Sequence, residues 1–113
     1  MIAETRRVVG TGPTYISFDV DVLDPVYAPG TGTPEIGGIT TYDAQLLIRG
    51  LHGPELNGGD VVEVSPPFDM SGNTALVAVT MMFEIQCCSP KCRVPGTSPH
   101  FSGKHDWIKR RQQ

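Results

Sequence analysis

Two carboxylates, Asp19 and Asp21, stand at the end of an apolar run and lead directly into a loop rich in glycine and proline. Residues 14–20 alternate β-forming side chains and predict a strand. Because alternate side chains of a strand share a face, we expect both carboxylates to point the same way. Neighbouring carboxylates repel unless a cation or proton lies between them, and hard divalent cations take oxygen ligands. The pattern therefore indicates a metal site at the C-terminal edge of a parallel sheet.

Two other interpretations of these aspartates stay open on the strand pattern alone. Aspartate at a strand end is frequently a turn former or the N-cap of the next element, which would make Asp19 and Asp21 structural. Residues 18–22 also resemble the nucleophile motif of haloacid-dehalogenase-like phosphatases, in which Asp19 would attack phosphorus and Asp21 would be the general acid. The lysine and acidic motifs that such phosphatases carry downstream are not evident, which argues against this hypothesis.

A third carboxylate, Glu63, belongs to a second β-forming run at residues 61–64. In open α/β sheets, ligands bind outside the carboxyl ends of the strands. We therefore expect Glu63 to lie on the same sheet edge as Asp19 and Asp21. The alternative is that Glu63 is a buried charge paired with an arginine or a lysine.

Longer motifs carry a family resemblance. Residues 17–38 read SFDVDVLDPVYAPGTGTPEIGG, and residues 60–69 and 71–76 read DVVEVSPPFD and SGNTAL. Together they strongly resemble the ureohydrolase family of arginases and agmatinases, and PGTGTPEIGG looks more like agmatinase than arginase. The gap-free first motif is much more specific than a lone DxD. The resemblance implies that residues 1–90 are the C-terminal portion of a ureohydrolase domain.

That resemblance assigns roles to individual residues. Asp19 matches the carboxylate that bridges two manganese ions, and Asp21 matches a ligand to one of them. Glu63 matches the acidic residue that holds the substrate guanidinium, and Thr33 matches the loop threonine that supports that glutamate. Asp24 matches a family position outside the ligand set, so capping or loop support is its expected role.

The resemblance also implies a fold and a reaction. The fold would be α/β, part of an arginase-like three-layer structure with a parallel sheet flanked by helices, incomplete in this chain. The reaction would be manganese-dependent hydrolysis of a small guanidino compound, with agmatine favoured and putrescine and urea as products. Two ions ~3.5–4 Å apart lower the pKa of a bridging water, and a fixed carboxylate can orient the guanidinium. Another guanidino-acid hydrolase or an arginase is the alternative.

The other metal ligands of the family come from G-G-x-H and D-A-H-x-D motifs, and neither occurs here. The histidines, His52, His100 and His105, have the wrong spacing and context, so we expect them to be structural or solvated. Since several ligands per ion are expected, we predict that the chain alone is inactive. A non-catalytic product that binds a full-length subunit is a further alternative, because ureohydrolases usually assemble as homo-trimers or hexamers.

Composition agrees with a partial domain. With 13 glycines and 10 prolines among 113 residues, much of the chain should be loop. We predict the end of a helix at 1–9 and helices near 41–51, capped by Thr40 or Thr41, and at 73–88. The last helix is expected to bury Ala75, Ala78, Val79, Met82, Phe83 and Ile85. So few elements cannot cover both faces of a parallel sheet, and we expect exposed apolar surface.

The remaining features are compositional. Residues 91–113 predict a disordered tail without a family counterpart, and a net charge of -3 gives no support for nucleic-acid binding despite its basic end. Cys87, Cys88 and Cys92 lack CxxC spacing, which fits a reducing compartment and argues against a zinc site. No apolar run approaches the ~20 residues of a membrane span, and no targeting peptide is visible. We expect an intracellular protein, either mitochondrial or cytoplasmic.

Overall fold

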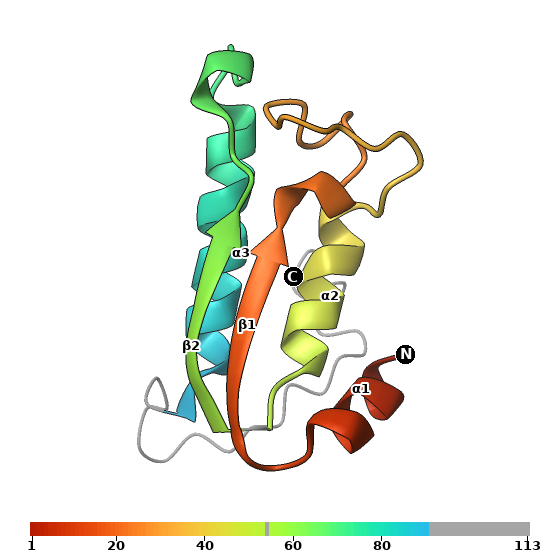
Figure 1. Cartoon of the computed structure of the whole chain (residues 1–113), viewed down its shortest axis with the longest axis vertical. Coiled ribbons are helices and arrows are strands. Elements are labelled where there is room, and N and C mark those ends of the chain that lie inside the picture. Colours follow the sequence, from red (N-terminus) through yellow and green to blue (C-terminus); the bar gives the residue numbers. More distant parts are fainter. Residues whose placement is uncertain (54, 91–113) are drawn as a thin grey trace, which may run out of the picture.

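The structure, a computed structural model, describes residues 1–53 and 55–90, and Figure 1 shows their arrangement. The elements in chain order are α1 (Ile2–Val9), β1 (Pro13–Asp19), the 3-10 turn η1 (Val20–Val22), α2 (Thr41–Gly50), β2 (Glu55–Val62), the 3-10 turn η2 (Pro66–Phe68) and α3 (Asn73–Cys88). β1 and β2 pair in parallel as a two-stranded sheet, and α2 lies in the connection between them. The predicted α/β class with a parallel sheet is confirmed.

One face of this sheet carries the core. α3 packs on β2 and against α2, and in Figure 1 it runs behind the sheet. Ile16, Phe18 and Val61 of the sheet pack against the buried cluster, whose members are Leu23, Ala28, Ala44, Ile48, Leu56, Met81, Ile85 and Cys88. On the alternate positions of β1 the side chains are exposed, and Tyr15 is 61% accessible. The expected exposed apolar surface is therefore confirmed.

Local sequence explains where α2 begins. Thr40 is the N-cap, as predicted: its hydroxyl accepts the Asp43 N–H at 3.0 Å. Asp43 in turn accepts the Thr40 N–H, which completes a capping box. The helix then buries Ala44 and Ile48.

β2 is longer than the sequence predicts, because it begins at Glu55 and passes through Gly58 and Gly59. Glycine is depleted in strands, so this stretch gives no strand signal. The structure supplies the reason for Gly59: a Cβ there would lie 2.6 Å from Ile85 Cγ2 and 2.8 Å from the carbonyl oxygen of Ile16. Glycine at this position lets α3 approach the sheet closely.

The helix predicted at 73–88 is confirmed as α3, but its predicted buried side is partly wrong. Val79 and Phe83 are 67% and 62% exposed, whereas the buried positions are Thr74, Ala78, Met81, Glu84, Ile85 and Cys88. Apolar residues occur nearly all round this helix, so periodicity alone does not identify the face that packs.

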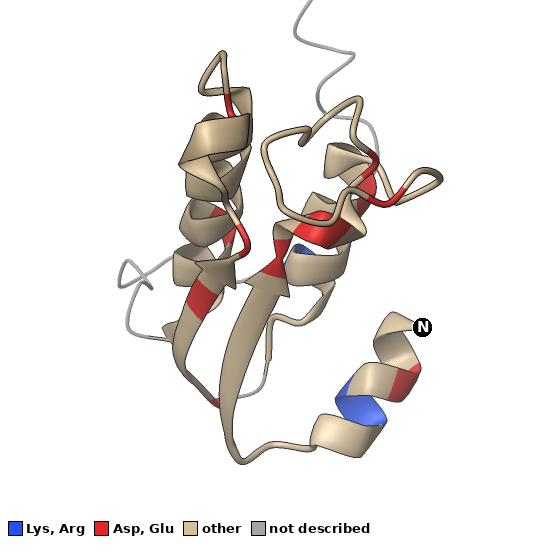
Figure 2. Ribbon diagram, turned by 45° about the horizontal axis from the view of Figure 1, so that its top comes forward, with Lys and Arg blue, Asp and Glu red and all other residues tan. Residues whose placement is uncertain are grey.

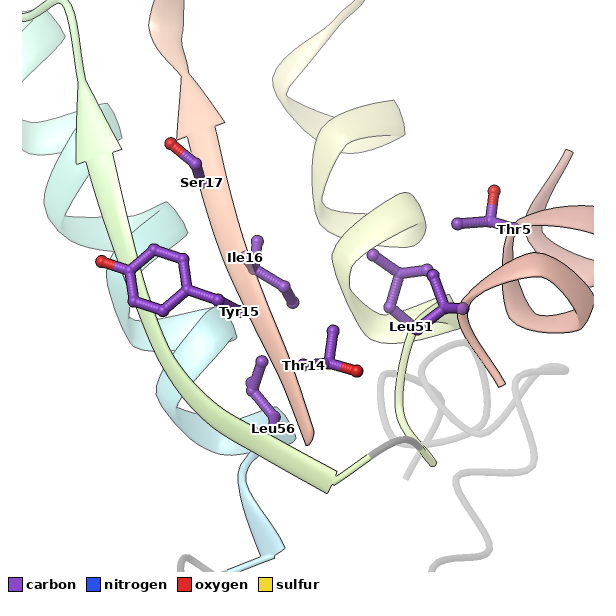
Figure 3. A pocket seen from close by; sticks show the side chains of 8 residues that line it. Thr5, Thr14, Tyr15, Ile16, Ser17, Leu51 and Leu56 are labelled. Carbon is purple, nitrogen blue, oxygen red and sulfur yellow. The ribbon is translucent and has the colours of Figure 1, made fainter. Parts of the chain in front are cut away.

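An apolar hollow runs beside β1 on the side that faces α1, as Figure 3 shows. Thr5 of α1, Ile16 of β1 and Leu51 are among its lining residues. It lies along the strand, away from the strand end that carries Asp19. No helix within residues 1–53 and 55–90 is long and apolar enough to cross a membrane. The predictions for the tail, for His100, His105 and Cys92, fall outside the described residues.

Candidate functional site

The two strands end level with each other. The parallel register pairs Asp19 with Val62, the last residues of β1 and β2. Because neighbouring strands lie about 4.8 Å apart, Glu63 leaves β2 close to the point where the chain leaves β1. Figure 2 shows acidic residues gathered at this end of the sheet and on the loop above it. The structure thus brings Asp19 and Glu63 to one sheet edge.

Asp21 reaches this edge by a turn and not by strand alternation. β1 ends at Asp19, and Val20–Val22 forms η1, so the expectation that both aspartates share a strand face is wrong. Asp19 is the N-cap of η1, and its Oδ1 accepts the Asp21 N–H at 2.9 Å. The capping role is therefore confirmed for Asp19. This hydrogen bond occupies Oδ1, and Oδ2 accepts none from the part of the chain that the structure describes.

Both carboxylate oxygens of Asp21 accept hydrogen bonds from threonine hydroxyls. Thr31 donates to Oδ1 and Thr33 donates to Oδ2. The Thr33 hydroxyl thus contacts Asp21, whereas the family resemblance led us to expect contact with Glu63. Thr31 was missed by the sequence analysis, because the stretch that carries it was predicted to be loop, where strand alternation gives no signal. These donors are neutral, so they orient the carboxylate without compensating its charge.

Asp24 organises the loop that carries the threonines. Its Oδ1 accepts the Val26 N–H at 3.0 Å, and its Oδ2 accepts the Gly37 N–H at 2.9 Å. These backbone hydrogen bonds, that of Val26 first, lower the pKa of the Asp24 carboxyl. The expected role of Asp24 in capping or loop support is confirmed.

The loop is also fixed to the start of α3 at Gly30. The Gly30 N–H donates to Thr74 Oγ1 at 2.7 Å, and its carbonyl accepts the Ser65 N–H at 2.8 Å. A Cβ at Gly30 would lie 2.4 Å from Asp69 Cβ, so a larger residue would force the loop and Asp69 to shift apart. Asp69 caps α3 by accepting the N–H groups of Thr74 and Ala75 at 3.0 and 2.9 Å, and this bonding, that of Ala75 first, lowers its pKa.

Glu63 has an unusual backbone. Its φ is 66°, and it is the one non-glycine residue with positive φ among the described residues. Such a conformation costs on the order of 1 kcal/mol and is common at functional sites. Glu63 is exposed, and the ion pairs of the described residues join Arg7 to Glu4 and Arg49 to Glu84. Glu63 is therefore neither buried nor ion-paired within residues 1–53 and 55–90.

The donors suit a hard cation but do not complete a site. Carboxylate oxygens such as those of Asp19 and Asp21 are the ligands that manganese favours. Within residues 1–53 and 55–90, however, no group of three or more His, Cys, Asp or Glu side chains is placed to hold a metal ion. His52 lies just beyond α2, where its carbonyl accepts from Arg6. The two aspartates therefore fit as part of a donor set.

Comparison with known proteins connects this arrangement to a family. The family model described as "Arginase family" matches residues 1–88. Guanidinopropionase from Pseudomonas aeruginosa is 72% identical over 86 residues, covering 76% of this chain and 27% of that protein. The human protein named "Guanidino acid hydrolase, mitochondrial" is 56% identical over 91 residues, covering 80% and 26%. The crystal structure of a hypothetical agmatinase from Burkholderia thailandensis superposes with a TM-score of 0.72 at 44% identity, covering 77% and 28%.

These matches settle the fold class and the family while leaving most of the relatives uncovered. The chain spans about a quarter of the length of the curated relatives it matches, 27% and 26% of the two described above. Arginase-like structures share its α/β arrangement, which confirms the expected but incomplete fold. The phosphatase hypothesis is excluded. The chain belongs to the arginase family, whose members are hydrolases of guanidino compounds.

Proposed function

We propose that the whole protein hydrolyses a linear guanidino compound to urea and an amine, and that this chain supplies part of its metal site and the anchor for the guanidinium. The observation that carries the proposal is the grouping of Asp19, Asp21 and Glu63 where β1 and β2 end. These carboxylates lack a cationic partner among the described residues. A site that attracts metal ions and a guanidinium needs such uncompensated charge.

Asp19 and Asp21 would hold manganese in the assembled site. Asp19 caps η1 through Oδ1, and its carboxylate would contribute oxygen to manganese, in the role that the family resemblance gives it. Asp21 is held by two hydroxyls, which suits a ligand to one ion. Manganese, when bound, supplies a water that is deprotonated near neutral pH. The remaining ligands would come from protein outside this chain, in keeping with its coverage of about a quarter of its relatives.

Glu63 would bind and orient the substrate. A guanidinium is planar, cationic and rich in N–H donors, so a fixed carboxylate can accept two of its hydrogen bonds. The exposed side chain of Glu63 is available for this contact, and its backbone is fixed in one unusual conformation. Thr33 would contribute to substrate binding by holding the neighbouring Asp21 carboxylate in place.

Two substrate classes have support. The 72% identity with guanidinopropionase favours a guanidino acid, in which the tail ends in a carboxylate. The loop sequence PGTGTPEIGG favours agmatine, in which the tail ends in an amine. We put the guanidino acid first because that identity extends over 86 residues, whereas the loop motif covers ten.

The remaining properties of the whole protein follow from the family. We propose a trimer or hexamer, as is usual among ureohydrolases, and no catalysis by the 113-residue chain alone. The human relative is named mitochondrial, so a mitochondrial location is as well supported as a cytoplasmic one.

The proposal is tested with a grafted enzyme, in which the matched stretch of this chain replaces the corresponding stretch of the P. aeruginosa guanidinopropionase. We expect manganese-dependent release of urea from guanidinopropionate by the grafted enzyme and none by the 113-residue chain. A folded graft that binds manganese normally and releases no urea would contradict the proposed role. The ratio of activity on guanidinopropionate to activity on agmatine, compared with the parent enzyme, tests the substrate class, and a shift towards agmatine would favour agmatine.

A further inference from the structure

We infer that Thr31 is a positioning residue for the Asp21 carboxylate, and that its main chain separately contacts the segment that follows Glu63. The inference rests on the proposed function, in which Asp21 is a manganese ligand. It starts from a difference between two threonines that both donate to Asp21. Thr31 is 3% exposed, whereas Thr33 is exposed.

Burial makes the hydrogen bond of Thr31 the more rigid of the two. A buried hydroxyl cannot exchange its partner for water, so the Thr31 hydroxyl is committed to Asp21 Oδ1. Water can compete for the hydrogen bond that the exposed Thr33 hydroxyl donates to Oδ2. With Oδ1 held from a buried side, rotation of the Asp21 carboxylate is restricted, and its lone pairs keep a fixed direction.

The backbone of Thr31 is fixed as firmly as its side chain. Gly30, directly before it, is hydrogen-bonded to Thr74 and Ser65, and a Cβ on Gly30 would clash with Asp69. Thr31 itself forms an antiparallel bridge with Val64, the residue after Glu63.

One residue therefore contacts both halves of the site. The Thr31 hydroxyl holds the Asp21 carboxylate, and its main chain holds the segment in which Glu63 has a φ of 66°. A substitution that removes only the hydroxyl should disturb the first contact and leave the second intact. This separation makes the inference testable by metal affinity and substrate affinity in the same variant.

The test compares Thr31→Val with Thr31→Ser in the grafted enzyme. Valine keeps the shape and removes the hydroxyl, whereas serine keeps the hydroxyl. Loss of a hydrogen-bond partner of a metal ligand lowers metal affinity about 10–100-fold. We expect a manganese dissociation constant raised about 10–100-fold for Thr31→Val and within about threefold of the parent graft for Thr31→Ser. Thr80→Val is the matched control, since its hydroxyl donates to Leu76 of its own helix, and its manganese affinity should not change.

A kinetic measurement separates positioning from general destabilisation. With saturating manganese, Thr31→Val should recover turnover, and its KM for guanidinopropionate should match that of the parent graft. A loss that excess manganese does not restore, or manganese affinity unchanged in Thr31→Val, would overturn the inference. Should Thr31→Val not fold, Thr31→Ser with weakened manganese binding would overturn it equally. If the parent graft binds manganese and hydrolyses substrate and Thr31→Val behaves in the same way, only this inference is wrong. If the parent graft does neither, the proposed function is wrong.

Discussion

The contact between α2 and α3 and the end of the sheet both hold carboxylates, but within residues 1–53 and 55–90 only the first pairs a carboxylate with a cationic side chain. Glu84 of α3 is 8% exposed and accepts bidentate hydrogen bonds from the Arg49 guanidinium of α2, with Nε 2.8 Å from Oε2. Asp21, at the sheet end, accepts from two neutral threonine hydroxyls. The Glu84 carboxylate is therefore paired with a cation at the helix contact, whereas the Asp21 carboxylate at the sheet end has no such partner among the described residues.

The difference distinguishes a carboxylate whose charge is paired from one whose charge is not. A buried carboxylate next to a guanidinium is a finished structural contact, and it raises the pKa of Arg49 mainly through the hydrogen bond with Glu84. Carboxylates that are oriented but not compensated need a cation from elsewhere. The helix contact thus contributes to the stability of this chain, and the sheet end is where the proposed site lies.

The largest expected effect is that of Asp19→Asn in the grafted enzyme. Under the proposed function Asp19 is a direct metal ligand, and an amide there removes a negative charge from the site, so the loss of manganese affinity should exceed the roughly 100-fold caused by losing a hydrogen-bond partner of a ligand. We expect manganese content and urea release to fall together while the circular dichroism spectrum stays unchanged. Normal manganese content in Asp19→Asn would show that the bridging assignment is wrong.

Glu63→Gln should separate substrate binding from metal binding. A hydrogen bond to a charged group contributes about 1.5–3 kcal/mol, which corresponds to roughly 10–100-fold in kcat/KM. We expect that loss for guanidinopropionate in the grafted enzyme, with manganese content equal to that of the parent graft. Unchanged kinetics would remove Glu63 from the site.

Arg49→Met tests the contact between α2 and α3. Removing one partner of a buried pair costs about 3–5 kcal/mol, and because the Arg49 side chain is 43% exposed we expect less, about 2–3 kcal/mol. The measurement is the free energy of unfolding of the 113-residue chain from urea titration. Arg7→Met is the matched control, since its pair with Glu4 is exposed and should contribute little to the free energy of unfolding. Equal effects from the two variants would refute the distinction.

Gly30→Ala should have the smallest effect of the four. The added Cβ would lie 2.4 Å from Asp69 Cβ, and such overpacking costs about 1–2 kcal/mol in the free energy of unfolding. Gly32→Ala is the control, because a Cβ there meets nothing within 4 Å. If both variants are equally stable in urea titration, the loop is not fixed at Gly30 as described.

Features that depend on neighbouring residues in the chain could be predicted from the sequence. Thr40 caps α2 and Asp24 binds the Val26 N–H, because each partner lies only a turn away along the chain. The helix at 73–88 follows from composition and length. The placement of Asp19 and Glu63 on one edge follows from two parallel strands, since their carboxyl ends must meet.

Features set by tertiary contacts could not be predicted. The start of β2 could not be predicted because Gly58 and Gly59 are poor strand formers. Their small size is needed only because Tyr15 and α3 approach them closely. The buried face of α3 depends on Glu84 meeting Arg49, which reverses the usual preference of a glutamate for solvent. The partner of Thr33 depends on how the loop folds back over η1.

Manganese retention tests the central claim most directly. The 113-residue chain and the grafted enzyme would each be dialysed against micromolar manganese, and the metal that remains bound per chain would be measured. The account predicts manganese bound by the grafted enzyme, no retention by the isolated chain, and loss from the graft on Asp19→Asn. Stoichiometric manganese on the isolated chain, with urea released from guanidinopropionate or agmatine above a protein-free blank, would contradict it.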